Sequence, residues 1–250
     1  MPWWSSETMG DMTTTTAPPR RRRPRRSVGR RLTSLLGALL IVVGLGLIGW
    51  FAWQYFGTNI VAKQAQTQIK QATVAEWDNG IEGEAVALVR IPRFGQDFEM
   101  PVLKGWDQAQ LAKGIGMYEK SSKPGAIGNF VIAGHRVTHG EPFRDFLKLR
   151  AGDLVEVETR QKIYTYKLEG NGDAITVDFT TSWPLWKVPD KDWDNSPPTE
   201  AKITLLTCSE LFHTRNRNVV VGDLVKTIDK ATTQPPPDRV KKTPAPEGDA

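Results

Sequence analysis

Lys202-Ile203-Thr204-Leu205-Leu206-Thr207-Cys208 is the stretch of sequence that decides the fold. Its alternation and its β-branched side chains predict a strand. Cys208, the last residue of that strand, is the only cysteine in the chain, so an internal disulfide is ruled out. Because a strand end is held rigidly by its sheet and can still be reached from outside, the position suits a nucleophile. A buried structural cysteine is the alternative interpretation.

A second predicted strand, residues 218–228, follows closely. The short separation predicts an antiparallel hairpin in which Arg217, at the start of this strand, lies opposite Cys208. A cation in that place can stabilise a thiolate or a developing oxyanion. Arg215 is expected in the connecting loop as a solvated charge.

A histidine is the third candidate for chemistry. Residues 128–133 predict a strand that runs into His135, so this ring should project from the rim of the sheet. His139 lies four residues further on in a polar loop, and His213 lies in the loop after the cysteine. On spacing alone, each of these histidines is a possible acid/base partner.

Short β-rich runs continue through the middle and the end of the chain. Turn signals such as Ala151-Gly152-Asp153 and Gly170-Asn171-Gly172-Asp173 separate them. Many short strands with no strong helix between them predict a mainly β fold, a closed or nearly closed antiparallel barrel with short helices. The strands are expected at residues 85–91, 129–133, 154–159, 163–168, 203–207 and 218–228.

The positive charge of the chain is concentrated at its N-terminus. The 250 residues carry a formal net charge of +5. Residues 1–31 alone contain eight arginines against Glu7 and Asp11, a net of +6. The remainder is therefore close to neutral, and nucleic-acid binding loses its main support.

An uncharged apolar stretch, residues 32–56, follows the arginines. At ~1.5 Å per residue, a helix of this length covers the roughly 30 Å hydrocarbon core of a membrane. A cleaved signal peptide is the competing interpretation, but its apolar region is only about 7–15 residues long, and no Ala-x-Ala site directly follows here. With arginines on one flank and Trp50, Trp53 and Tyr55 at the other, we expect a single-pass protein of the cell membrane, with its N-terminus in the cytoplasm and the rest outside.

The other segments complete the expected domain organisation. Small apolar residues recur at three- and four-residue steps between residues 58 and 77, which predicts a modest amphipathic stalk helix. The apolar face of this helix consists of Ala62, Ala65, Ile69 and Ala72. The expected parts are a disordered basic cytoplasmic tail (1–31), a transmembrane helix (32–56), a stalk helix and linker (57–83), one globular domain (84–229) and a disordered C-terminal tail (230–250).

These motifs together resemble the sortases, a family of cysteine transpeptidases. Thr204-Leu205-Leu206-Thr207-Cys208 is similar to their T-L-x-T-C signature, and Ala133-Gly134-His135 resembles the segment with their catalytic histidine. Arg217 and the strand after it are similar to the arginine and strand of the family, and Leu88-Val89-Arg90-Ile91-Pro92 and Pro101-Val102 resemble its first strands.

The resemblance covers about residues 84–229 and implies the closed β-barrel of the sortases. It also implies that Cys208 is the nucleophile, His135 its acid/base partner and Arg217 the cation that stabilises the substrate. No cofactor is expected, because no cluster of metal ligands is visible in the sequence.

Within the family, Gly134-His135-Arg136-Val137-Thr138-His139-Gly140 followed by Pro142-Phe143 resembles class E, the housekeeping type of many actinobacteria. Residues 181–199, with three tryptophans, are longer and more aromatic than that class implies between its last core strands. The residues expected to bind substrate are Tyr118, Thr138, Thr207 and Trp186.

The function that this resemblance implies is a two-step acyl transfer. Cys208 cleaves the Thr–Gly bond of a Leu-x-x-Thr-Gly sorting signal, expected to be Leu-Ala-x-Thr-Gly, and becomes a thioacyl enzyme. An amine of a lipid-linked peptidoglycan precursor then accepts the acyl group. The expected partners are secreted proteins with a C-terminal sorting signal, this precursor and the membrane.

Three other functions are alternatives to this one. An L,D-transpeptidase places its cysteine in a Ser-x-Gly-Cys context, which Leu206-Thr207-Cys208 does not match. A pilus-polymerising sortase is closer, but the Asp-Pro-aromatic lid that such enzymes usually carry and the second membrane span that they often carry are not visible. A membrane-tethered binding barrel, in which Cys208 is inert, is the non-enzymatic alternative.

Overall fold

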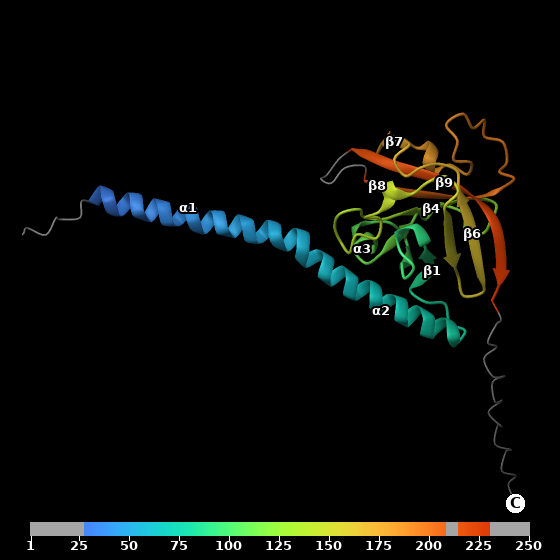
Figure 1. Cartoon of the computed structure of the whole chain (residues 1–250), viewed down its shortest axis with the longest axis horizontal. Helices are drawn as coiled ribbons and strands as arrows, with labels where there is room; N and C mark the ends of the chain where they lie inside the picture. Colours follow the sequence, from blue (N-terminus) through green and yellow to red (C-terminus); the bar gives the residue numbers. More distant parts are fainter. Residues whose placement is uncertain (1–27, 209–214, 231–250) are drawn as a thin grey trace, which may run out of the picture. The chain divides into compact units, whose positions relative to one another are not determined.

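The computed structural model describes residues 28–208 and 215–230, which are coloured in Figure 1. The chain divides into two units, Met1–Ile48 and Gly49–Ala250. Most of the two predicted disordered tails lies outside the described residues.

The helix α1 (Val28–Ala52) contains residues 32–52 of the predicted apolar stretch, and the last four residues of that stretch lie in a π-helical turn. Its segment Arg31–Ala52 is 22 residues long with a mean hydropathy of 2.5, and no part of its most apolar window is buried inside the protein. Exposed apolar surface costs about 25 cal/mol per Å² in water. By length and composition, α1 is able to cross a membrane.

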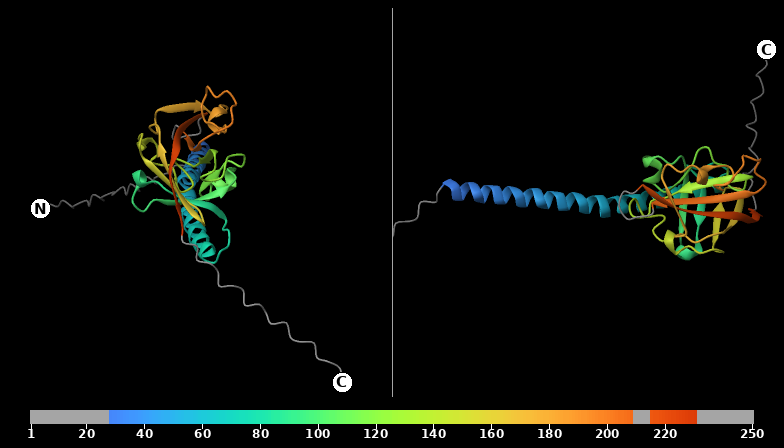
Figure 2. Two further views of the ribbon diagram at one scale, coloured as in Figure 1. Left: turned by 90° about the vertical axis from the view of Figure 1, so that its right-hand side faces the viewer. Right: turned by 90° about the horizontal axis from the view of Figure 1, so that it is seen from above.

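In the described part of the chain, nine strands form one sheet (Figure 1). The strands are β1 (Ala85–Arg90), β2 (Glu99–Lys104), β3 (Ile115–Met117), β4 (Gly128–Ala133), β5 (Leu154–Glu158), β6 (Lys162–Leu168), β7 (Ile175–Asp178), β8 (Ala201–Cys208) and β9 (Asn216–Asp229). Eight of them follow one another around a barrel in the order β6-β5-β1-β2-β3-β4-β8-β9, and β9 closes the ring on β6. Figure 2 shows this barrel from two further directions. The predicted closed β-barrel is confirmed.

Two pairings run parallel, so the expectation of an antiparallel barrel was wrong there. β2 pairs with β3, and β4 pairs with β8, in parallel. Parallel neighbours need a long crossover, and all of β5, β6 and β7 lies between β4 and β8 in the chain. The alternation of a strand shows which face is buried and not the direction of its neighbour.

Three strands fall outside the set predicted from alternation, although the family resemblance included Pro101-Val102 of β2. β2 contains Pro101, which lacks the N–H of a normal ladder residue, and β3 has only three residues with Gly116 at its centre. β7 is a four-residue strand that pairs with the start of β9. Each of these strands is too short or too atypical in composition to stand out as alternation.

The barrel has an inner core and a second, outer cluster. Phe130 and Ile132 of β4 lie in the inner core, while the residue between them, Val131, lies in the outer cluster with Leu206 and Val219. This alternation follows from the two-residue period of a strand. Because β4, β8 and β9 are packed on both faces, they give the site a rigid support.

The helix α2 (Thr58–Asp78) follows a π-helical turn, Trp53–Gly57. Its buried residues form one stripe, Ala62, Gln66, Ile69, Thr73 and Trp77. Ile69 packs on Ala85 and Leu103 of the first two strands. The segment predicted as a stalk therefore lies against the barrel, and Ala72 of its predicted apolar face is exposed.

Candidate active site

The ends of three neighbouring strands bring the predicted residues to one edge of the barrel. β4 and β8 run parallel with Ala133 opposite Leu206, so both end at this edge. β8 and β9 are antiparallel, and the Cα atom of Cys208 lies opposite that of Arg217. This is the register predicted for the hairpin. His135 follows β4 after one glycine, while His213 lies outside the described residues.

Thr207 fixes the chain just before His135. Its hydroxyl donates to the carbonyl oxygen of Gly134 at 2.8 Å, and the amide of Gly134 donates to the carbonyl of Leu206 at 3.2 Å. The side chain of Thr207, expected to bind substrate, is thus buried and has a partner inside the protein. This hydrogen bond joins the end of β8 to the end of β4.

Gly134 is a position where a side chain has no room. A Cβ atom added there would lie 2.9 Å from the ring of Phe143, which is fully buried. The amide of Phe143 donates to the carbonyl of His135 at 2.9 Å. The backbone of His135 is therefore held on both sides, by β8 and by the loop that returns to Phe143.

The ring of His135 stacks on the ring of His139, with a centroid distance of 4.7 Å and an interplanar angle of 26°. The Nδ1 atom of His139 lies 3.0 Å from the hydroxyl of Thr138. Burial lowers the pKa of His139, since it disfavours the charged ring. At neutral pH, His139 therefore places an uncharged ring beside His135.

The two arginines that follow the cysteine in the sequence differ in their position relative to β9. Arg217 lies within β9, opposite Cys208 on one side and Val177 on the other, and its Nη1 atom donates to the carbonyl of Asn216 at 2.9 Å. Arg215 precedes the strand, and its side chain is 75% exposed and lies 3.4 Å from the carboxylate of Asp178. Only Arg217 has its backbone fixed by neighbours on both sides.

The backbone positions of Cys208 and Arg217, and the end of the strand that leads into His135, lie at this edge. A thiol, an imidazole and a guanidinium are groups that can together carry out nucleophilic acyl transfer. Among the residues that the structure describes, no group of three or more histidine, cysteine, aspartate or glutamate side chains is arranged to hold a metal ion.

Tyr118 belongs to an aromatic pair that the sequence only half revealed. It follows β3, and its ring lies 4.6 Å from that of Trp106. Both rings pack on the outer cluster of β4, β8 and β9. A Cβ atom on Gly116 would come within 2.8 Å of the Trp106 backbone. A glycine inside a strand is typical of such a close approach, so Gly116 is the sequence signal for this pair.

The loop at residues 181–199 is organised by a buried amide. Asn129, 1% exposed, donates to the carbonyls of Pro184 and Trp186, both at 2.9 Å, and accepts from the hydroxyl of Thr204 at 2.8 Å. Because Asn129 lies four residues before the end of β4, the backbone of Trp186 is anchored about 13 Å from that end of the strand. It is Trp183 that packs on the same cluster as Tyr118.

Comparisons with known proteins identify the family. The family model described as Sortase domain matches residues 89–225, more than half of the chain. Sortase SrtE1 of Streptomyces coelicolor is 31% identical over 214 residues, which are 80% of this chain and 59% of that protein. The structure of sortase E from Streptomyces avermitilis has 33% identity and a TM-score of 0.52, covering 58% of this chain and 91% of that one. The crystal structure of Sortase E1 from Streptomyces coelicolor with a tripeptide in the active site has 33% identity and a TM-score of 0.50. The match covers 61% of this chain and 94% of that one.

The chain therefore belongs to the sortase family, the cysteine transpeptidases, and its relatives include class E sortases. It spans 59% of the length of SrtE1. The resemblance inferred from the T-L-x-T-C motif is confirmed at the level of the family.

Proposed function

We propose that this chain is a membrane-anchored sortase that cleaves the Thr–Gly bond of a Leu-x-x-Thr-Gly sorting signal and transfers the protein to an amine of a lipid-linked peptidoglycan precursor. The observation that carries this proposal is the strand register. The Cα atom of Cys208 lies opposite that of Arg217, and the parallel strand β4 ends beside them and leads into His135.

In the first step, the thiolate of Cys208 attacks the carbonyl carbon of the threonine. A C–S bond forms, the C–N bond to glycine breaks, and the imidazolium of His135 gives its proton to the departing amine. Arg217 stabilises the negative charge on the carbonyl oxygen. In the second step, the acceptor amine attacks the thioester, a C–N bond replaces the C–S bond, and His135 takes the proton as the thiolate leaves.

The substrate peptide would lie along the outer face of β4, β8 and β9. Tyr118 and Trp106 give this face an aromatic wall, which is typical of a peptide site. The tripeptide in the active site of the related Sortase E1 supports the same use here. Thr138, in the loop after His135, is the polar residue that we propose beside the substrate. The backbone of Trp186 is anchored at the start of β4, away from the edge with Cys208. We therefore propose that Trp186 contacts only the part of a peptide substrate that lies farthest from the scissile bond.

The sorting signal is proposed to be Leu-Ala-x-Thr-Gly, because the relatives of the chain include class E sortases. With an amine acceptor present, Leu-Ala-x-Thr-Gly peptides should be cleaved faster than Leu-Pro-x-Thr-Gly peptides, as measured by product formation in chromatography. Equal rates, or faster cleavage of the proline peptide, would remove this specificity and leave the chemistry intact. If the chain cleaves neither peptide, the proposed function is wrong.

Two observations support an acceptor at the membrane surface. The apolar segment ends at Ala52, and the side chain of Asn59 already accepts a hydrogen bond from the amide of Gly140, in the loop after His135. Seven residues span at most about 25 Å even when fully extended. We propose that the candidate active site therefore stays within reach of a lipid-linked amine at the outer face of the membrane.

The proposed orientation has the N-terminus inside, because arginines flank the segment on that side. A protease added to intact cells stripped of their wall should digest the domain after Phe56 and spare the first thirty residues. Antibodies against each end, used on blots of the digest, measure this. A protected barrel with a digested N-terminus would reverse the orientation.

A further inference from the structure

The helix α2 touches the loop that carries the histidines. Asn59 and Gln66 are seven residues apart, which is two helical turns, so they lie on the same face of the helix. Both belong to the side of α2 that packs on the rest of the domain, and Gln66 is 5% exposed. Neither residue has a function in the reaction described above.

Three hydrogen bonds join these side chains to consecutive residues of the loop. The Oδ1 atom of Asn59 accepts from the amide of Gly140 at 2.9 Å, and its Nδ2 atom donates to the carboxylate of Glu141 at 3.0 Å. The Nε2 atom of Gln66 donates to the carbonyl of His139 at 3.1 Å. Each partner lies more than seventy residues away in the chain, so this is tertiary docking.

The loop has a conformation that it would not keep by itself. His139 and Glu141 both have a φ of 54°, and Gly140 between them has a φ of 80°. Side chains rarely adopt this left-handed region, so a run of three such residues persists only where the surroundings hold it. A Cβ atom on Gly140 would lie 2.5 Å from the side-chain nitrogen Nε2 of Gln66. The left-handed run of residues 139–141 therefore packs closely on α2.

The same loop determines where the ring of His139 lies, and that ring stacks on His135 at 4.7 Å. A change in the backbone at residues 139–141 would therefore move a direct neighbour of the proposed acid/base. Since a misplacement of about 1 Å can cost on the order of a hundredfold in rate, the docking of α2 is able to control turnover.

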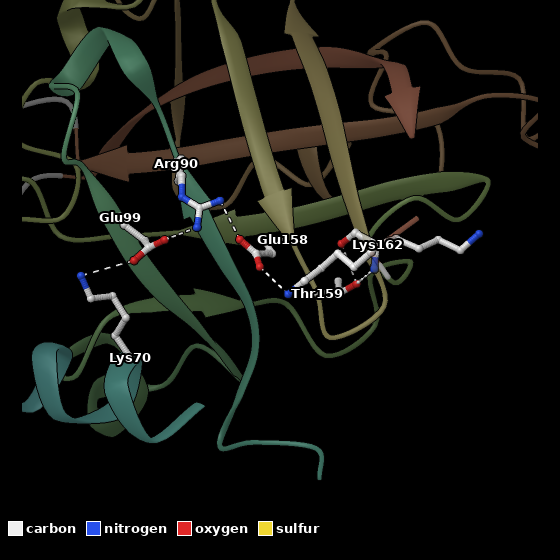
Figure 3. A network of polar contacts seen from close by, with 7 residues as sticks. Lys70, Arg90, Glu99, Glu158, Thr159 and Lys162 are labelled. Atoms are coloured by element: carbon white, nitrogen blue, oxygen red, sulfur yellow. Dashed lines mark hydrogen bonds and ion pairs between the residues drawn. The ribbon is translucent and has the colours of Figure 1, made fainter. Parts of the chain in front are cut away.

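A second set of contacts holds the later part of α2 and makes the helix a fixed part of the domain. Lys70 lies 3.3 Å from Glu99, which also pairs with Arg90, and Arg90 pairs with Glu158 at 2.6 Å (Figure 3). Lys230 then lies 2.5 Å from Glu158 and 5.0 Å from the centre of the Trp77 ring, back on α2.

We infer that Asn59 and Gln66 are positioning residues of the active site, through which the helix next to the apolar segment sets the place of His135. This inference rests on the proposed function. On this inference, α2 belongs to the catalytic domain and holds the loop between His135 and Phe143 in place by hydrogen bonds.

The test uses the full chain in detergent and follows transfer of a Leu-Ala-x-Thr-Gly peptide to an amine. Asn59→Ala and Gln66→Ala should each lower kcat by about tenfold or more, while KM stays within about twofold, because the aromatic pair Trp106 and Tyr118 on the peptide face is untouched. Gln64→Ala and Gln68→Ala are the matched controls, since both glutamines are exposed on the same helix, and they should keep the wild-type kcat. Thermal unfolding of each variant reports whether it is folded.

A compensating pair separates positioning from simple loss of structure. Asn59→Asp places two carboxylates together and should lower kcat. Adding Glu141→Gln restores the hydrogen bond between the two side chains, with the amide of residue 141 now donating to the carboxylate of residue 59, and should recover most of kcat. Glu141→Gln alone should give a kcat no higher than that of the wild type.

Wild-type kcat in Asn59→Ala and Gln66→Ala, an equal loss in the two glutamine controls, or no recovery in the pair would each overturn the inference. If the wild-type chain itself forms no product, the proposed function fails first and the inference fails with it.

Discussion

Cys208→Ala is expected to abolish both cleavage of the sorting peptide and its transfer to an amine. The chain has one cysteine, so no other thiol can form the acyl enzyme. Loss of a catalytic nucleophile costs on the order of a million-fold in kcat where it has been measured in a serine protease. The rate should therefore fall below detection in a chromatographic assay, and Cys208→Ser should be nearly as inactive, because the hydroxyl is a far weaker nucleophile than the thiolate.

The control for this variant is its folding. Cys208 is the last residue of β8, and Ile203 and Leu205 of the same strand are fully buried in the core. The unfolding temperature should therefore stay close to that of the wild type. Measurable transfer by a folded Cys208→Ala chain would exclude the proposed mechanism, because the acyl group would then have to pass through a residue other than Cys208.

Arg217→Ala is expected to lower kcat by roughly a hundredfold or more, the scale seen when one oxyanion donor is removed. The reason is the place of Arg217 within β9, paired with Cys208 on one side and with Val177 on the other. Arg217→Lys should recover only part of the loss, since a point charge lacks the planar fork of the guanidinium. Steady-state kinetics on the peptide measure both.

Arg215→Ala is the matched control, because it removes the same side chain two residues earlier. Arg215 pairs with Asp178 and lies over the ring of Phe179 at 5.2 Å, in an exposed place where such contacts contribute little. Its kcat should remain within a few-fold of wild type. A larger loss for Arg215→Ala than for Arg217→Ala would show that the cation has been assigned to the wrong residue.

The hairpin of β8 and β9 could be predicted because alternation and distance in sequence act together there. Burying Ile203, Leu205 and Val220 on one face leaves a single register, since a slip by one residue would turn them to the other face. That register places Arg217 opposite Cys208. The closed barrel followed from the number of short strands, but the directions of β3 and β8 did not, because burial patterns do not record a neighbour's direction.

The docking of α2 could not be predicted from apolar periodicity. Two of the five residues in its buried stripe, Gln66 and Thr73, are polar. A count of apolar residues therefore predicted Ala65 and Ala72 on the buried face, where Gln66 and Thr73 lie instead. The Gln66 side chain is buried because it finds a carbonyl partner in the loop at His139. Such a partner, seventy-three residues away, is invisible to any local pattern. The pair of Trp106 and Tyr118 differs in this respect: it joins two strand ends that are separate in the sequence, but Gly116 gives a local signal for it.

The central claim is that Cys208 carries the acyl group, and the mass of the intact chain tests it most directly. The full chain in detergent is incubated with a Leu-Ala-x-Thr-Gly peptide without an amine acceptor, quenched in acid and weighed by mass spectrometry. The mass should rise by that of the acyl fragment ending in threonine, hydroxylamine should remove the adduct, and digestion should locate it on the peptide that contains Cys208. Cleavage of the substrate with no adduct on the chain, or an adduct on any other residue, would contradict the account.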